Sequence, residues 1–191
     1  AYFTDEPLIG AETAECAALV RRADNLVFVY PSTLSTVPPG LKGWIDRTFV
    51  PGVAFTLGDR AGSKHGLSHI RNLTGIALYD ESRLDVLRQG DNGRRLIRRS
   101  IRLCGGLRTR SHWIGHDSSS MSSGRWRARD GVRVKVVVAY AHPCEESYAA
   151  AVRDRVIGGL RVAGCQPLLI DLYGSLYDPC LPFPVADARA L

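Results

Sequence analysis

The chain has 191 residues, of which 45% are hydrophobic and 23% charged, and this composition fits one globular domain spanning residues 1–191 with no low-complexity linker. No apolar run approaches the ~20 residues that a transmembrane helix needs, so we expect no membrane partner. The net charge of +6 suits nucleic acid or anionic ligands, but no helix-turn-helix, zinc finger or aromatic RNA-binding pattern is present, so we expect no nucleic-acid partner.

The first third of the chain predicts a helix, a strand and a second helix. Residues 12–23 place Cys16, Leu19, Val20 and Ala23 on one stripe of a helix. The apolar run "NLVFVY" at 25–30 predicts a buried strand. A helix over 40–49 follows two prolines, which suit a helix start.

The middle third predicts two strands that flank a basic helix. The run "NLTGIALY" at 72–79 is a strand of the buried type. The segment 93–103 predicts an amphipathic helix whose arginines face solvent and whose apolar face carries Leu96, Ile97, Ile101 and Leu103, and Gly105 and Gly106 end it. The segment 109–115 is polar at several positions, so it is predicted as a strand at the edge of the sheet.

The last third predicts a strand at 134–140, a helix from Glu145 to a C′ residue at Gly164, and a strand at 167–173. Strands that alternate with helices across short links indicate a doubly wound α/β fold with a parallel sheet. The five cysteines are scattered, odd in number and never form a C-x-x-C. This argues against a disulfide framework or zinc site, so we expect no metal and a cytoplasmic localisation.

The loop between the strand at 134–140 and the following helix has the features of an anion site. Unpaired N–H groups at a helix N-terminus attract anions, Ser147 adds a hydroxyl and His142 adds a ring N–H. The loop has neither the glycines of a dinucleotide-binding motif nor the lysine of a P-loop. Glu145 and Glu146 would cap the helix or repel a phosphate. An anion site and an ordinary capped helix start both remain open.

Two separate segments resemble the NAD(P)H:quinone oxidoreductase family, flavin enzymes with a flavodoxin-like fold. The first lies within 27–57, where the matching residues are Leu41, Lys42, Gly43, Trp44, Asp46, Arg47, Phe49, Pro51, Gly52 and Phe55. The second is similar to the loop after the family's first strand, and its matching residues are His142, Pro143, Ser147 and Tyr148. "YDPCLP" at 177–182 resembles the segment that follows the family's second strand.

The matching segments stand in a different order from that of the family, which predicts a circular permutation. The family's own ends would be joined near 122–134, with new ends between its second strand and second helix. We therefore predict a five-stranded parallel sheet in the spatial order 2-1-3-4-5 of the family, with the 167–173 strand at one edge and the 109–115 strand at the other. Exchange of the carboxyl-terminal third between two protomers is the alternative.

The resemblance implies FMN or FAD as cofactor and NAD(P)H as electron donor, with two electrons passed to a quinone-like acceptor by a ping-pong mechanism. It assigns catalysis to Tyr79 and His142. The implied cofactor-binding residues are His142, Ser147, Tyr148, Pro31, Ser32, Thr33, Leu34, Ser35 and Tyr79. The implied substrate pocket contains Trp44, Phe55 and Asp80, and the family also implies a homodimer.

Two loops depart from the family pattern. The loop after Pro31 has small residues where the family has aromatic ones, and Asp80 stands where the family has glycine. These departures leave two alternative functions open. One is an ancillary or regulatory relative with a degenerate flavin site, and the other is a non-redox enzyme that uses the same pocket.

Overall fold

The structure is a computed structural model that describes residues 11–56, 64–117 and 134–175. Among these residues, no helix is long and apolar enough to cross a membrane. Two predicted features lie outside the described residues: the segment 177–182, which includes Cys180, and the connection at 122–133.

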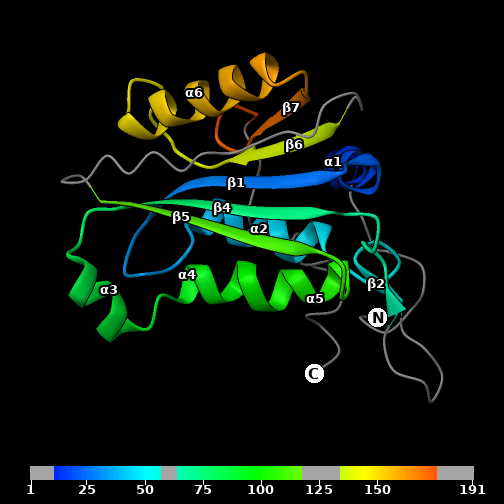
Figure 1. Cartoon of the computed structure of the whole chain (residues 1–191), viewed down its shortest axis with the longest axis horizontal. Coiled ribbons are helices and arrows are strands. Elements are labelled where there is room, and N and C mark those ends of the chain that lie inside the picture. The colour runs from blue at the N-terminus through cyan, green and yellow to red at the C-terminus, as the bar shows by residue number, and fades with distance from the viewer. Residues whose placement is uncertain (1–10, 57–63, 118–133, 176–191) are drawn as a thin grey trace, which may run out of the picture.

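A five-stranded parallel sheet forms the centre of the fold (Figure 1). In spatial order, its strands are β7 (Gln166–Asp171), β6 (Lys135–Tyr140), β1 (Asn25–Ser32), β4 (Asn72–Tyr79) and β5 (Arg110–Asp117). This confirms the predicted spatial order, including the polar strand at an edge. The order in space and the order in the chain together match a permuted arrangement. How it arose, by permutation or by exchange between protomers, stays a prediction.

Helices cover both faces of the sheet, as Figure 1 shows. On one face lie α1 (Ala11–Arg22), α2 (Pro39–Thr48) and the arginine-rich helix, which pack against Phe28 and Tyr30 of β1. On the other face α6 (Tyr148–Val162) packs against Val27 and Val29. Alternate residues of β1 thus face opposite layers, and both sets are buried, which is why the strand is a continuous apolar run.

The arginine-rich helix is a continuous succession of α4 (Asn92–Arg95), the π-helix η1 (Leu96–Ile101) and α5 (Arg102–Gly105). Ile97 and Ile101 are buried against the sheet, which confirms two of the predicted core positions. Leu103 is 67% exposed, so its predicted place on the apolar face was wrong. Gly106 has φ +82 and ends the helix, as predicted.

Three further elements were not predicted, because each is too short to show a period. The helix α3 (Arg83–Gln89) follows β4, and Ser82 caps it by accepting a hydrogen bond from the N–H of Asp85. The strands β2 (Phe55–Thr56) and β3 (Lys64–His65) form a small antiparallel pair.

Gly75 of β4 lies opposite Trp113 of β5, and a Cβ at this glycine would lie 2.3 Å from the indole. The missing side chain therefore lets the indole lie across β4, where it meets the ring of Tyr30 edge-on at 6.4 Å.

Candidate functional site

The two loops that carry the family-like motifs follow neighbouring strands. β1 and β6 are paired in parallel, with Val29 opposite Tyr140, so the loops that follow them leave the same edge of the sheet. The helix after β1 lies on one face and the helix after β6 on the other. This change of side is the topological switch point, where open α/β sheets bind ligands. We call loops 31–36 and 141–147, together with Tyr79, the strand-tip site.

His142 presents one ring nitrogen away from its own loop. Its Nδ1 lies 3.0 Å from the backbone nitrogen of Cys144 and 3.1 Å from the carbonyl oxygen of Cys144. The loop backbone therefore occupies Nδ1 in either protonation state. Nε2 has no hydrogen-bond partner among the described residues, so it is the atom that can meet a ligand.

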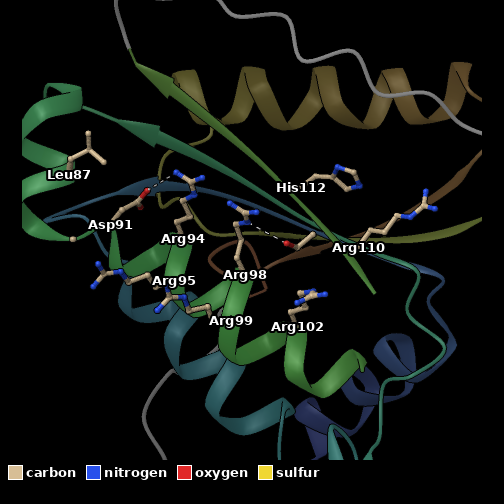
Figure 2. Close-up of a pocket in the computed structure, with 11 residues that line it drawn as sticks. Leu87, Asp91, Arg94, Arg95, Arg98, Arg99, Arg102, Arg110 and His112 are labelled. Atoms are coloured by element: carbon tan, nitrogen blue, oxygen red, sulfur yellow. Dashed lines mark hydrogen bonds and ion pairs between the residues drawn. The ribbon is translucent and has the colours of Figure 1, made fainter. Parts of the chain in front are cut away.

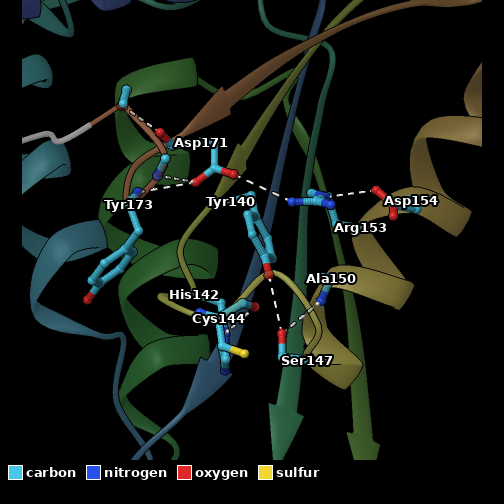
Figure 3. A network of polar contacts seen from close by, with 11 residues as sticks. Tyr140, His142, Cys144, Ser147, Ala150, Arg153, Asp154, Asp171 and Tyr173 are labelled. Carbon is cyan, nitrogen blue, oxygen red and sulfur yellow. Dashed lines mark hydrogen bonds and ion pairs between the residues drawn. The ribbon is translucent and has the colours of Figure 1, made fainter.

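The helix after this loop begins at Tyr148, three residues later than predicted, because Ser147 caps it (Figure 3). Ser147 Oγ accepts a hydrogen bond of 3.2 Å from the N–H of Ala150. Glu145 and Glu146 are exposed and precede the cap, so neither acid caps the helix. The first N–H groups of α6 have no acceptor within the helix, which leaves an electropositive end beside His142.

A polar network holds this helix against the two neighbouring strands (Figure 3). The guanidinium group of Arg153 lies 4.7 Å from the centre of the Tyr140 ring and 3.4 Å from Asp171 of β7. Asp171 also accepts hydrogen bonds from the N–H groups of Tyr173 and Gly174. Sequence reasoning missed Arg153 and Asp171, although an aspartate before a Gly-Ser turn is a usable turn signal.

Tyr148 points toward a different strand from the one expected. Its hydroxyl lies 3.0 Å from Nε2 of His116 on β5, and the two rings meet edge-on at 5.5 Å. The ring is 55% exposed. The structure thus joins the Tyr148 side chain to His116 rather than to His142, and its assignment to cofactor binding stays a prediction.

Of the loop predicted to line a flavin ring, only part faces outward. Thr33 and Leu34 are exposed, Pro31 is half-buried, and Ser32 and Ser35 are buried. Leu34 and Ser35 both have left-handed backbones, with φ values of 50 and 56. Two successive positive φ values form a tight turn that normally needs Asn-Gly, so Leu34 is held in a strained, exposed position. The side chains of Ser32 and Ser35 are buried, and their assignment to cofactor binding stays a prediction.

The hydroxyl of Tyr79 is already hydrogen-bonded, to Asp91 at the start of the arginine-rich helix. Its hydroxyl donates a hydrogen bond of 2.9 Å to Asp91, whose carboxylate lies 4.0 Å from Arg94. Burial, followed by the interactions with Asp91, raises the pKa of Tyr79 well above its ordinary value. Tyr79 therefore stays protonated at neutral pH, and its proton is directed at Asp91. Asp80 is exposed beside it.

Trp44 and Phe55 do not lie at the strand tips. Trp44 is 0% exposed and meets Phe28 and Phe49 edge-on, within the hydrophobic core. Phe55 is half-buried in β2, which Figure 1 shows near the end of α5, at the far end of the strands. The structure therefore corrects the assignment of both aromatic residues to a substrate pocket.

Comparison with known proteins identifies the fold. Residues 3–78 match the model of a family described by its flavodoxin-like fold. Together with the sheet order, this match shows that the fold is flavodoxin-like. No curated protein matches the chain.

Two solved structures are similar to parts of the chain. An NAD(P)H:quinone oxidoreductase from Methanothermobacter marburgensis is 21% identical, with a TM-score of 0.48 over 63% of this chain and 60% of that one. The protein Smu.1420 from Streptococcus mutans UA159 is 22% identical, with a TM-score of 0.47 over 59% of this chain and 65% of that one. The chain thus spans less than two thirds of the length of either protein.

Proposed function

We propose that the chain is a flavin-dependent oxidoreductase that takes two electrons from NAD(P)H and passes them to a quinone or a similar aromatic acceptor. One observation carries the proposal: the His142 loop and the Leu34 loop lie at the tips of paired strands, at the switch point of a flavodoxin-like sheet. Bound there, FMN or FAD would supply the hydride and electron transfer.

The residues of the strand-tip site suit the phosphate end of a flavin. The N–H groups of Tyr148 and Ala149, the first two of α6, have no acceptor among the described residues, and neither has Nε2 of His142. The Arg153 network fixes the position of this helix end. At the other loop, Pro31 and Leu34 offer apolar surface for a flat ring system. The exposure of Asp80 keeps its carboxylate in water, which limits repulsion of a negatively charged cofactor.

One observation favours a second candidate, an ancillary relative without redox activity. Tyr79 and the serines at 32 and 35 are turned inward or already hydrogen-bonded, so few side chains remain to hold the flavin ring. Such a protein would keep the fold and bind flavin weakly or not at all.

Flavin uptake separates the two candidates. The purified chain is incubated with excess FMN or FAD, dialysed, and examined for visible flavin absorbance. The oxidoreductase retains flavin, loses its colour on anaerobic addition of NADPH or NADH, and regains it when a quinone is added. A colourless protein that also fails to quench free flavin fluorescence contradicts the proposal and supports the ancillary relative.

We also propose that the protein is a homodimer. In this chain the exposed face of α2 carries Lys42 and Asp46, which form an ion pair at 2.5 Å, while Trp44 lies in the core. A dimer contact through this helix would therefore use its polar face. Light scattering coupled to size-exclusion chromatography measures the mass, and a monomer at all concentrations contradicts this proposal.

A further inference from the structure

The arginine-rich helix, β5 and the end of α3 line an open cavity of about 830 Å³, which we call the arginine groove. Among the described residues, its charged lining consists of one aspartate, Asp91, and six arginines: Arg94, Arg95, Arg98, Arg99, Arg102 and Arg110. Figure 2 shows Arg94 and Arg98 reaching from the helix toward β5. Sequence analysis treated these arginines as a solvated helix face, whereas the structure makes them the wall of a concave site.

The positive charge of the groove is largely uncompensated. The one carboxylate of the lining lies 4.0 Å from Arg94 and accepts the hydrogen bond of Tyr79. Arg95 and Arg99 have no ion pair among the described residues. Like charges four residues apart destabilise a helix, and a cleft lined by one sign of charge concentrates the opposite ion. The groove is therefore built for an anion.

Two of the arginines are held in place by neutral partners. Arg98 Nε donates a hydrogen bond of 3.3 Å to the hydroxyl of Ser111, and Arg102 Nε donates one of 3.0 Å to the carbonyl oxygen of Thr109. These bonds orient the guanidinium groups toward β5 without neutralising them. Within the described ranges, the groove is lined by arginine and by no lysine. Guanidinium groups in fixed orientations suit phosphate, which accepts two parallel hydrogen bonds from each.

From this geometry we propose that the arginine groove binds a small molecule that carries two or more consecutive phosphate groups. Five positive charges in excess match the charge of a diphosphate or triphosphate, because each terminal phosphate carries about −1.5 to −2 at neutral pH. The cavity volume falls in the range of small-molecule sites, about 300–1,000 Å³. Among the described residues no Phe, Tyr or Trp lines the groove and His112 is its one ring-bearing side chain, so the groove offers little stacking surface for the successive bases of a single-stranded nucleic acid.

Isothermal titration calorimetry tests the proposal with inorganic phosphate, pyrophosphate and tripolyphosphate on the flavin-free protein. Affinity should rise with the number of phosphates and fall with salt. The double variant R95Q/R99Q should weaken pyrophosphate binding at least about tenfold, because each arginine offers charge-assisted hydrogen bonds. The control R155Q/R161Q removes the same charge from exposed positions of α6 on the other face and should keep the affinity within about twofold.

The same titration identifies the source of the phosphates. ATP binding as tightly as tripolyphosphate supports recognition of the phosphate chain alone, and NADPH binding more tightly than NADH supports a pyridine nucleotide as the ligand. Equal weakening in R95Q/R99Q and R155Q/R161Q overturns the proposal, because bulk charge then accounts for binding. Tight binding of a single-stranded oligonucleotide that tripolyphosphate does not displace also overturns it.

Thermal unfolding checks that the groove variant is folded. Removal of like charges should leave its melting temperature equal or higher. R94Q/R110Q, which removes charge from both walls of the groove, provides a second pair and should show the same loss of affinity. The inference does not depend on flavin binding, so a protein that takes up no flavin can still confirm it.

Discussion

The strand-tip site and the arginine groove lie on the same sheet but attract anions in different ways. The strand-tip site uses a helix end and one imidazole nitrogen, and its nearest charged residues on the loop are Glu145 and Glu146. The groove uses six side-chain charges along the length of a helix and a strand. A site built on partial charges suits one phosphate whose position must be fixed, whereas a site built on full charges suits a chain of phosphates.

The two sites meet at Gly93. This residue lies in the first turn of the arginine-rich helix, and its N–H donates a hydrogen bond of 3.0 Å to the carbonyl oxygen of Ser35 in the Leu34 loop. A Cβ at Gly93 would lie 2.8 Å from the hydroxyl of Tyr30. Each site is therefore supported by an element of the other.

The largest expected effect comes from Gly93→Ala, which disturbs the contacts of Gly93 with the Leu34 loop and with Tyr30. The buried Tyr30 ring cannot move freely, so we expect a loss of about 1–3 kcal/mol in the free energy of unfolding. We also expect weaker binding of both FMN and pyrophosphate. Urea unfolding and the two titrations measure these effects.

Gly158→Ala is the matched control for this substitution. It also places an alanine in a helix, but a Cβ at Gly158 has no neighbour within 4 Å. We expect this variant to gain up to about 1 kcal/mol from helix propensity alone. If G93A weakened the binding of only one of the two ligands, FMN or pyrophosphate, the coupling of the two sites would be contradicted.

The next largest effect is expected for His142→Ala, which should affect the strand-tip site and not the arginine groove. His142→Ala removes the ring nitrogen that faces a ligand and should weaken FMN binding by about 1.5–3 kcal/mol, the range for hydrogen bonds to charged groups. Pyrophosphate binding in the groove should not change. His69→Ala removes an exposed histidine that contacts the carbonyl oxygen of Val20 and serves as control. Equal FMN affinity in H142A and the wild type would exclude His142 from the phosphate end.

The strand-tip site was partly predictable from the sequence. Nearly continuous Val, Ile and Leu runs predict buried parallel strands, and the two family-like motifs placed those strands in the correct order. The side-chain partners were not predictable. Trp44 could line a pocket or fill the core from the same helix position, and only the contact with Phe28 decides. The pairing of Tyr148 with His116 joins residues 32 positions apart, and no local pattern reports it.

The arginine groove was less predictable. The period of Ile97 and Ile101 predicts one buried and one solvated helix face, which the structure confirms. The concavity arises only when β5 lies beside that face, and Arg110 enters the site from that strand. The segment at 109–115 was predicted as an edge strand without any link to the helix before it.

Leu34→Gly has a smaller effect, in opposite directions on stability and binding. Glycine adopts a positive φ without strain, so the variant should gain up to about 1 kcal/mol in stability. It should also bind FMN less tightly, because the apolar side chain, which is 73% exposed, is lost. Urea unfolding and FMN titration measure the two changes. Lower stability in L34G would show that the turn is not strained.

The smallest effect at neutral pH is expected for Tyr30→Phe. This substitution is informative because its effect on stability should change with pH. The Tyr30 hydroxyl is buried and has no hydrogen-bond partner among the described residues, so its removal should change the stability at pH 7 by less than about 1 kcal/mol. Burial, followed by the nearby Tyr79 and Asp91, raises the pKa of Tyr30 far above its ordinary value of 10.0. Below pH 10 the phenol is protonated in both the folded and the unfolded chain and contributes no pH dependence. Above pH 10 only the unfolded chain releases the proton, so stability falls by up to about 1.4 kcal/mol per pH unit.

Urea unfolding at pH 7 and at about pH 11 should therefore show a smaller alkaline loss in Y30F than in the wild type. The remaining loss comes from Tyr79, whose pKa is raised by burial and by Asp91, and from Tyr140, Cys104 and Cys165, whose pKa values are raised mainly by burial. Tyr173→Phe, at an exposed position beyond β7, should keep the alkaline loss of the wild type. An unchanged loss in Y30F would mean that the buried phenol beside Gly93 is not the group that the folded chain keeps protonated. The region around Gly93, where the two sites meet, would then be more accessible to water than the burial of Tyr30 implies.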